Sequence, residues 1–154
     1  MAIEDDIKFL ERVPMLRLIG RAGLRIISIG AETRYVHGGE VLFHRDSHAD
    51  SGYVVQEGAF SLTADPTRDP VQTAGPGTLL AEMSLMAETV HSMTATASTP
   101  STVMRIPRSL FLKTLDGYPD AARRIRDHVL ARAKETERDL TRLHAHMSSS
   151  SRGP

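Results

Sequence analysis

Short β-prone segments that alternate with turn residues constrain the fold of this chain more than any other feature of its sequence. Such segments occupy residues 34–36, 41–43, 52–55, 59–63, 93–97 and 102–106. Glycine pairs or polar loops separate the first four, at Gly38-Gly39, residues 45–50 and Glu57-Gly58. Strands of this length, repeated about every ten residues between turn signals, are typical of an all-β sandwich or barrel and not of βαβ units. The sequence therefore predicts a mainly β body over residues 31–106.

Helical patterns flank this body on both sides. Residues 3–30 carry apolar side chains three or four positions apart, with an interruption at Pro14, which predicts N-terminal helices. Pro107 precedes a second helical pattern over residues 109–115, and Pro119 opens a third that no proline or glycine interrupts before Met147. We therefore expect one domain over residues 1–147, with C-terminal helices over residues 107–147. The polar tail, residues 148–154, is expected to be disordered.

The last helical segment, residues 120–147, contains a narrow apolar stripe. Its members recur at spacings of four and three residues: Val129, Ala133, Thr136, Leu140, Leu143 and Met147. This is the a/d pattern of a coiled coil, and charged residues such as Arg132 and Glu135 flank it. The pattern predicts a homodimer through this helix, while packing of the helix on its own domain is the alternative.

Composition excludes several classes of protein. None of the 154 residues is cysteine, which rules out disulfides, thiolate metal sites and cysteine nucleophiles. The formal net charge is zero, which argues against a free-standing nucleic-acid binder, and Arg123, Arg124 and Arg126 are typical of a solvated helix face. No apolar run is long enough to span a membrane and no secretory signal is present. We expect a cytoplasmic protein that contacts neither nucleic acid nor membrane directly.

The segment from Gly75 to Thr96 has the character of a binding site. A Pro-Gly turn leads into an apolar run in which Glu82 is the only acid, and His91 opens the strand that follows. A short helix that begins near Glu82 would direct unpaired backbone N–H groups at whatever lies above it, and an anion such as a phosphate suits that position.

These features, taken in order, resemble the cyclic nucleotide-binding domain of the catabolite-activator and regulatory-subunit superfamily. The resemblance covers residues 7–140 and rests on Gly38-Gly39, on Asp46 and Asp50, on the run from Tyr53 to Gly58 and on the segment 75–96. It implies an eight-stranded β-roll of the double-stranded β-helix or jelly-roll type. It also implies a short helix that holds the cyclic phosphate, and C-terminal helices that cover the pocket.

The resemblance assigns ligand-binding roles within the segment 75–96. Glu82 matches the glutamate that accepts a hydrogen bond from the ribose 2′-hydroxyl. Backbone N–H groups near the start of the short helix face the phosphate, and Ser92 matches a small polar residue that adds a hydroxyl contact. The implied binding set is Glu82, Met83, Ser84, Leu85, His91 and Ser92, with cyclic AMP or cyclic GMP as the ligand and no cofactor.

Three residues depart from the family pattern. Ala81 and Arg45 stand where the family usually has glycine, and His91 replaces the arginine that pairs with the phosphate. Arginine is always charged and binds phosphate through a planar fork, whereas histidine is mostly neutral above its ordinary pKa of about 6.5. The resemblance therefore implies a non-catalytic sensory module that binds a cyclic nucleotide weakly.

Two alternatives remain at this point. A cupin-like metal enzyme is suggested by His37, His44 and His48 with the later Glu57, but three residues separate the second and third histidines where the cupin pattern has one. Alternatively, the chain is the ligand-binding part of a catabolite-activator-type transcription regulator that lacks its DNA-binding part, because no helix-turn-helix pattern follows residue 147. The sequence identifies no protein partner.

Overall fold

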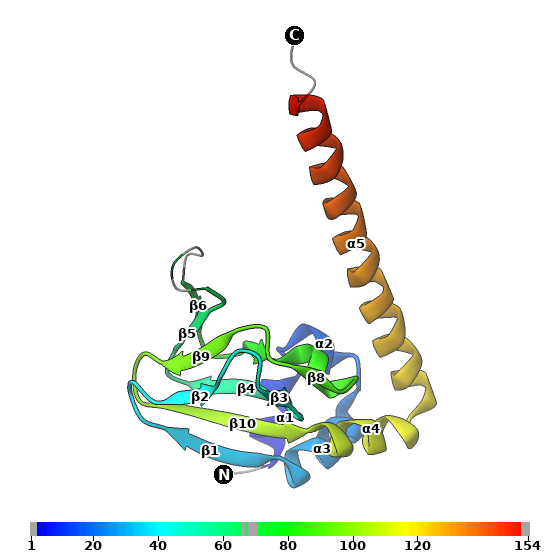
Figure 1. Cartoon of the computed structure of the whole chain (residues 1–154). Helices are drawn as coiled ribbons and strands as arrows, with labels where there is room; N and C mark the ends of the chain where they lie inside the picture. Colours follow the sequence, from blue (N-terminus) through cyan, green and yellow to red (C-terminus); the bar gives the residue numbers. More distant parts are fainter. Residues whose placement is uncertain (1–2, 66, 68–70, 152–154) are drawn as a thin grey trace.

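Three antiparallel sheets form the centre of the molecule (Figure 1). The computed structural model describes residues 3–65, 67 and 71–151, and their side chains as far as Glu135. The first sheet has the order β1 (Glu32–Val36), β10 (Ser101–Pro107), β4 (Ser51–Glu57) and β7 (Leu79–Leu80). The second has the order β2 (Val41–Phe43), β9 (Thr94–Ala97), β5 (Phe60–Thr63) and β6 (Gln72–Ala74), and the third pairs β3 (His48–Ala49) with β8 (Thr89–Val90).

Strands β4 and β10 serve two hydrophobic cores at once. Val54 pairs with Met104, and Val55 with Val103. Because successive side chains of a strand point to opposite faces, the first pair joins a core shared with the helices and the second joins the core inside the roll, where Phe60 is fully buried. The first sheet therefore lies between the helical layer and the second sheet.

The helices come from both ends of the chain and form a layer against the outer face of the first sheet. They are α1 (Ile3–Leu10), α2 (Pro14–Arg17), α3 (Arg21–Gly30), α4 (Arg108–Asp116) and α5 (Pro119–Ser151), together with one short 3₁₀ helix, η1 (Glu82–Leu85). Pro14 is the first residue of α2, where its missing N–H costs nothing. Gly20 precedes α3 with φ of 87°, a left-handed conformation that glycine adopts without strain.

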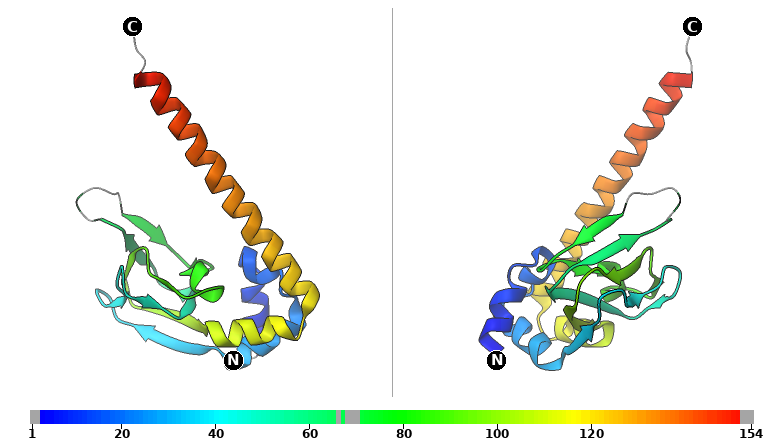
Figure 2. Two further views of the ribbon diagram at one scale, coloured as in Figure 1. Left: turned by 45° about the vertical axis from the view of Figure 1, so that its right-hand side comes forward. Right: turned by 90° about the vertical axis from the view of Figure 1, so that its left-hand side faces the viewer.

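Helix α5 begins at the body of the protein and then extends past the β-roll (Figure 2). Its 33 residues give a length of about 50 Å at 1.5 Å per residue. The sequence predicts an end near Met147 followed by a disordered tail, but the structure continues the helix to Ser151, because the serines from Ser148 onward disfavour a helix only weakly and no glycine or proline lies between Pro119 and Gly153. Residues 152–154 lie outside the described part.

The predicted fold class, mainly β with flanking helices on a β-roll, is confirmed. Each of the six β-prone segments of the sequence overlaps a strand, and the predicted helix over residues 109–115 corresponds to α4. The described residues contain ten strand segments where the resemblance implies eight strands, and three of the ten, β3, β7 and β8, are only two residues long. None of the described helices is both long enough and apolar enough to cross a membrane.

Candidate ligand-binding site

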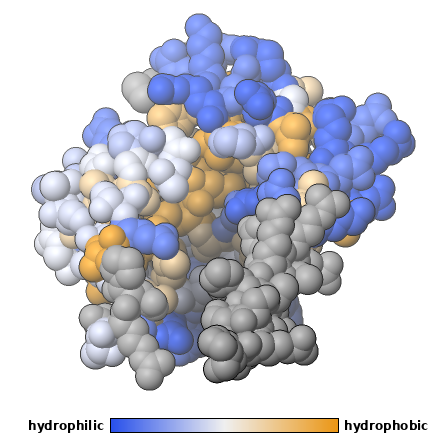
Figure 3. Space-filling view, turned by 90° about the horizontal axis from the view of Figure 1, so that it is seen from above, coloured by the Kyte–Doolittle hydropathy of each residue, from blue (hydrophilic) through white to orange (hydrophobic). Residues whose placement is uncertain are grey.

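A cavity of about 620 Å³ lies between the inner face of the roll, η1 and the first part of α5. Most of its wall is apolar, and seen from above the molecule is hollowed at its centre over a hydrophobic surface (Figure 3). Its lining comprises Phe43, Ala49, Leu62, Leu80, Ala81, Glu82, Met83, Ser84, Thr89, Val90, His91, Ser92, Met93, Val129, Arg132 and Ala133. A volume of this size holds a ligand of several hundred daltons.

Five of the six residues that the resemblance assigns to the site line this cavity. They are Glu82, Met83, Ser84, His91 and Ser92. The sixth, Leu85, is fully buried and packs in the core beneath the helices. A Cβ at Gly52 of β4 would lie 2.9 Å from the Leu85 side chain, so glycine at this position lets η1 sit directly on the strand.

The backbone enters η1 through Ala81, the residue that stands in place of the family's glycine. Ala81 has φ of 59° and ψ of 42°, a left-handed conformation that costs a residue with a Cβ about 1–2 kcal/mol. The cavity wall thus keeps the backbone path that a glycine would favour. In the other departure, Arg45 is not the strained residue, because the positive φ of that turn falls on Asp46, at 68°.

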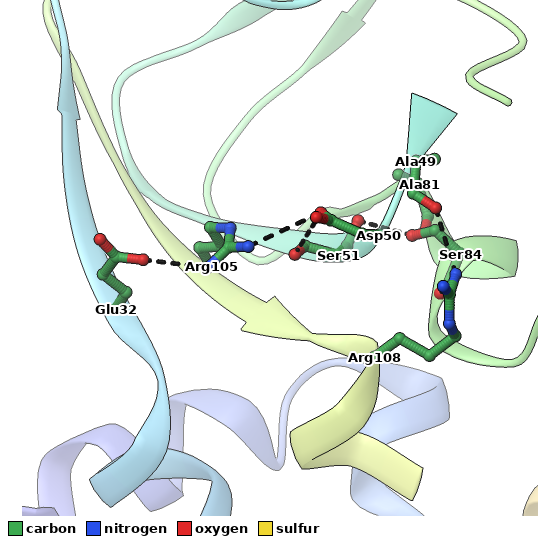
Figure 4. Close-up of polar contacts among 8 residues, drawn as sticks. All are labelled: Glu32, Ala49, Asp50, Ser51, Ala81, Ser84, Arg105 and Arg108. Atoms are coloured by element: carbon green, nitrogen blue, oxygen red, sulfur yellow. Dashed lines mark hydrogen bonds and ion pairs between the residues drawn. The ribbon is translucent and has the colours of Figure 1, made fainter. Parts of the chain in front are cut away.

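Ser84 is buried and its polar groups are occupied within the protein. Its hydroxyl lies within hydrogen-bond distance of the carbonyl oxygens of Ser51 and Ala81, and its backbone N–H donates to the Ala81 carbonyl at 3.1 Å. The hydroxyl has one proton to donate, which these two carbonyl oxygens share. Through the contact with Ser51, Ser84 ties the start of η1 to β4 (Figure 4).

Arg108, the first residue of α4, fixes the other end of η1. Its Nη1 donates to the carbonyl oxygens of Ala49 at 3.2 Å, Ser84 at 3.3 Å and Ala87 at 3.1 Å. Its Nη2 lies 3.9 Å from the Glu88 carboxylate. One guanidinium therefore joins β3, η1 and the loop after η1 to the start of α4 (Figure 4).

A second arginine links two strands and the residue between β3 and β4 beside this point. Arg105 of β10 donates to Glu32 of β1 at 3.0 Å and lies 3.6 Å from Asp50 (Figure 4). The Ser51 hydroxyl donates to the Asp50 carboxylate at 2.9 Å. This hydrogen bond lowers the pKa of Asp50, burial opposes it, and the charge of Arg105 lowers the pKa further, so Asp50 is anionic at neutral pH.

His91 lies in the cavity wall as a buried aromatic residue. It is 6% exposed and stacks on Phe43 with ring centroids 3.8 Å apart and 9° between the ring planes. Burial lowers the pKa of His91, and the nearby Asp50 carboxylate only partly opposes this effect. The imidazole is therefore neutral at physiological pH and supplies no permanent positive charge to the cavity.

The charged groups of the cavity are a glutamate from η1 and an arginine from α5. Arg132 Nη1 donates to Glu82 Oε2, and His128, one helical turn earlier, has its Nε2 4.0 Å from Glu82 Oε1. The Glu82 side chain is only 21% exposed, so its carboxylate depends on this partner for compensation. The hydrogen bond to Glu82 raises the pKa of Arg132.

The resemblance implies that C-terminal helices cover the pocket but assigns none of their residues to the site, and Val129, Arg132 and Ala133 of α5 line the cavity. The coiled-coil pattern places Val129 and Ala133 in a dimer stripe and Arg132 on its charged flank. In the structure the first two stripe positions face the protein's own pocket, while the side chains from Thr136 onward lie outside the described part. His128 and Arg132 are four residues apart and therefore lie on one face of α5. This spacing is the one local feature of the sequence that indicates a helix face directed at Glu82.

The histidines that suggested a metal enzyme do not form a ligand set. His37, His44 and His48 are all exposed. Among the described residues, no group of three or more histidine, aspartate or glutamate side chains is arranged to hold a metal ion. The geometry therefore gives the cupin alternative no site.

A β-roll, a short helix that bears a glutamate at a cavity and a C-terminal helix whose first part lines the same cavity define a small-ligand-binding regulatory domain. The chain belongs to the cyclic nucleotide-binding domain family, which matches residues 33–118. It is 32% identical to the solved cyclic nucleotide-binding-like protein of Brucella abortus, over 73% of this chain and 98% of that one, with a TM-score of 0.65.

Two further solved structures share the fold. The N-terminal domain of a transcriptional regulator from Streptomyces coelicolor is 24% identical, with a TM-score of 0.76 over 86% of this chain and 94% of that one. The sensor domain of the regulator DNR from Pseudomonas aeruginosa is 17% identical, with a TM-score of 0.72 over 95% and 93%. A curated lysophospholipase of Pyricularia oryzae is 25% identical over 116 residues, but the chain spans only 8% of its length, so its activity is not transferred.

Proposed function

We propose that this chain is a non-catalytic regulatory module of the cytoplasm that binds cyclic AMP or cyclic GMP in the cavity between the roll and α5. The observation that carries the proposal is Glu82, a mostly buried carboxylate that lines the cavity at the start of η1. It stands where the family's glutamate accepts the ribose hydroxyl. The apolar wall, with Leu62 and Val129, offers a surface for the purine ring.

The affinity is set by the residue at position 91. A neutral, stacked imidazole donates at most one hydrogen bond and lacks the planar, charged fork that arginine presents to a phosphate. The loss of one charge-assisted hydrogen bond corresponds to about 1.5–3 kcal/mol. We therefore expect wild-type affinities in the micromolar to millimolar range.

His91→Arg is expected to tighten binding of the preferred cyclic nucleotide by about ten- to a hundredfold, because it restores a permanent fork at the cavity wall. Isothermal titration calorimetry with cyclic AMP and cyclic GMP at neutral pH measures this change. His37→Arg is the matched control, since it makes the same substitution at an exposed histidine outside the cavity lining. If neither nucleotide binds the wild type or His91→Arg at millimolar concentration, the proposal is wrong.

A second candidate function follows from the structural neighbours. Two of them are domains of transcription regulators, which favours the ligand-binding part of a catabolite-activator-type regulator. The long α5, which extends past the roll (Figure 2), and the apolar stripe of its second half support association of two chains through this helix. In that case, the proposed homodimer would place two ligand pockets on either side of one helix pair.

Leu140→Asp is expected to shift this dimer to monomer, because it places an unpaired charge in the apolar stripe. Thr141→Asp, one position off the stripe, introduces the same charge and should leave the dimer intact. Multi-angle light scattering at micromolar concentration distinguishes the two. A wild type that remains monomeric at high concentration contradicts association through α5.

A further inference from the structure

The cavity contains an ion pair, between a carboxylate of η1 and a guanidinium of α5. A ligand in the cavity would lie between these two groups. Among the described lining residues, Glu82 and Arg132 are the only ones with a permanent charge. They come from positions 50 residues apart in the sequence and bond to each other across the gap between η1 and α5. His91, at the family's arginine position, is neutral because burial lowers its pKa.

The pair is complementary to a particular arrangement of ligand groups. A carboxylate accepts hydrogen bonds, and a guanidinium donates them to an anion. A ligand that inserts a hydroxyl beside the carboxylate and an anion beside the guanidinium would replace the ion pair without leaving either group uncompensated. A cyclic nucleotide presents such neighbours, because the carbon that bears its 2′-hydroxyl is bonded to the carbon that bears the 3′-oxygen of the phosphate.

We propose that Arg132 of α5, held by Glu82 when no ligand is bound, pairs with the cyclic phosphate and supplies the positive charge that His91 lacks. This inference rests on the proposed function and names a residue outside the segment 75–96 as a determinant of ligand binding. It also gives α5 a direct contact with the ligand.

The surroundings of Arg132 leave room for this exchange. Its side chain is 57% exposed, and a second cavity of about 360 Å³ lies on the other side of the ion pair. Residues of α2 and of the turn before β7 line that second cavity, together with Glu82, His128 and Arg132. Arg132 therefore borders both cavities, so part of its side chain lies next to open space.

The test compares five forms of the full chain by calorimetry with cyclic AMP and cyclic GMP at neutral pH: wild type, Arg132→Gln, Arg132→Lys, His91→Arg and the double variant His91→Arg/Arg132→Gln. We expect Arg132→Gln to weaken binding by about tenfold or more, and Arg132→Lys to weaken it less, because lysine keeps the charge but not the fork. In the double variant, the new arginine should restore affinity at least to the wild-type value. A sixth form, Arg123→Gln, is the control: Arg123 is an exposed residue of α5 that lies 3.7 Å from Asp120, and this variant should bind like the wild type.

The rescue separates phosphate pairing from a structural role, because His91→Arg cannot rebuild the contact between α5 and Glu82. Equal costs of Arg132→Gln in the wild-type and His91→Arg backgrounds would overturn the inference. So would unchanged or tighter binding by Arg132→Gln, which would make Arg132 a spectator or a competitor for Glu82; in either case, the proposed function stands. Binding by His91→Arg but not by the wild type also rejects the role of Arg132 and leaves the pocket assignment intact. No binding by either form removes the proposed function and the inference together.

Discussion

Glu82→Ala is expected to lower the affinity for cyclic AMP and cyclic GMP by at least about a hundredfold, which removes binding from the measurable range of a weak site. Glu82 is the only carboxylate among the described cavity-lining residues, and its loss removes a charged hydrogen bond to the ribose worth about 1.5–3 kcal/mol. The substitution also removes the group that holds Arg132 at the cavity. Both the hydrogen bond to the ribose and the contact that holds Arg132 favour binding of the same ligand. Their combined loss should therefore lower the affinity more than the loss of either one alone.

The fold should survive this substitution, so that the loss of binding reports on the site. The ion pair of Glu82 is formed with an arginine that is 57% exposed, and solvent-screened pairs of this kind contribute about 1 kcal/mol or less to stability. Calorimetry for binding and thermal unfolding for stability measure the two effects. Glu57→Ala, an exposed carboxylate of β4 outside the cavity lining, is the control, and binding by Glu82→Ala within tenfold of it would contradict the assigned role.

Most of the fold could be predicted from local pattern. The strands that are longest or most regularly spaced, such as β4 and β10, coincide with β-prone segments, because alternation of side chains is visible over four or more residues. The pairs β3, β7 and β8 are two residues long and show no period. Their positions depend on the register of longer strands, for example Tyr53 of β4 opposite Leu80 of β7, and no local signal encodes that register.

The site could be predicted only in its contiguous part. Glu82 and His91 are nine positions apart in one segment, so a family resemblance in that segment was enough to propose them. Arg132 reaches the cavity because α5 docks on the domain, and its sequence context is that of an exposed, charged helix face. The surroundings of His91 could not be predicted either, since the burial that lowers its pKa and its stacking on Phe43 depend on residues distant in sequence.

Arg108→Met is expected to destabilise the protein by about 2–3 kcal/mol, although Arg108 does not line the cavity. Its guanidinium donates to three carbonyl oxygens, those of Ala49, Ser84 and Ala87, and its side chain is only 16% exposed. Methionine fills a similar volume but donates nothing, so partly buried carbonyl groups lose their partner at about 1–3 kcal/mol for each fully unsatisfied group. The three hydrogen bonds are 3.1–3.3 Å long and come from one nitrogen. Each is therefore weak, and we expect their combined contribution to stability to lie near the lower end of the sum of these costs.

The loss should be felt most where the arginine joins separate elements. Arg108 joins Ser84 and Ala87 to α4 and β3, so the amide hydrogens of residues 82–88 should exchange faster in Arg108→Met, while those of β10 keep their relative protection. Chemical denaturation gives the stability change and hydrogen exchange gives its location. Arg123→Met, the same substitution at an exposed arginine of α5, is expected to stay within about 0.5 kcal/mol of the wild type. If Arg108→Met behaves like this control, Arg108 does not fix η1 to the helical layer, and the cavity wall must be held by Ser84 and Leu85 alone.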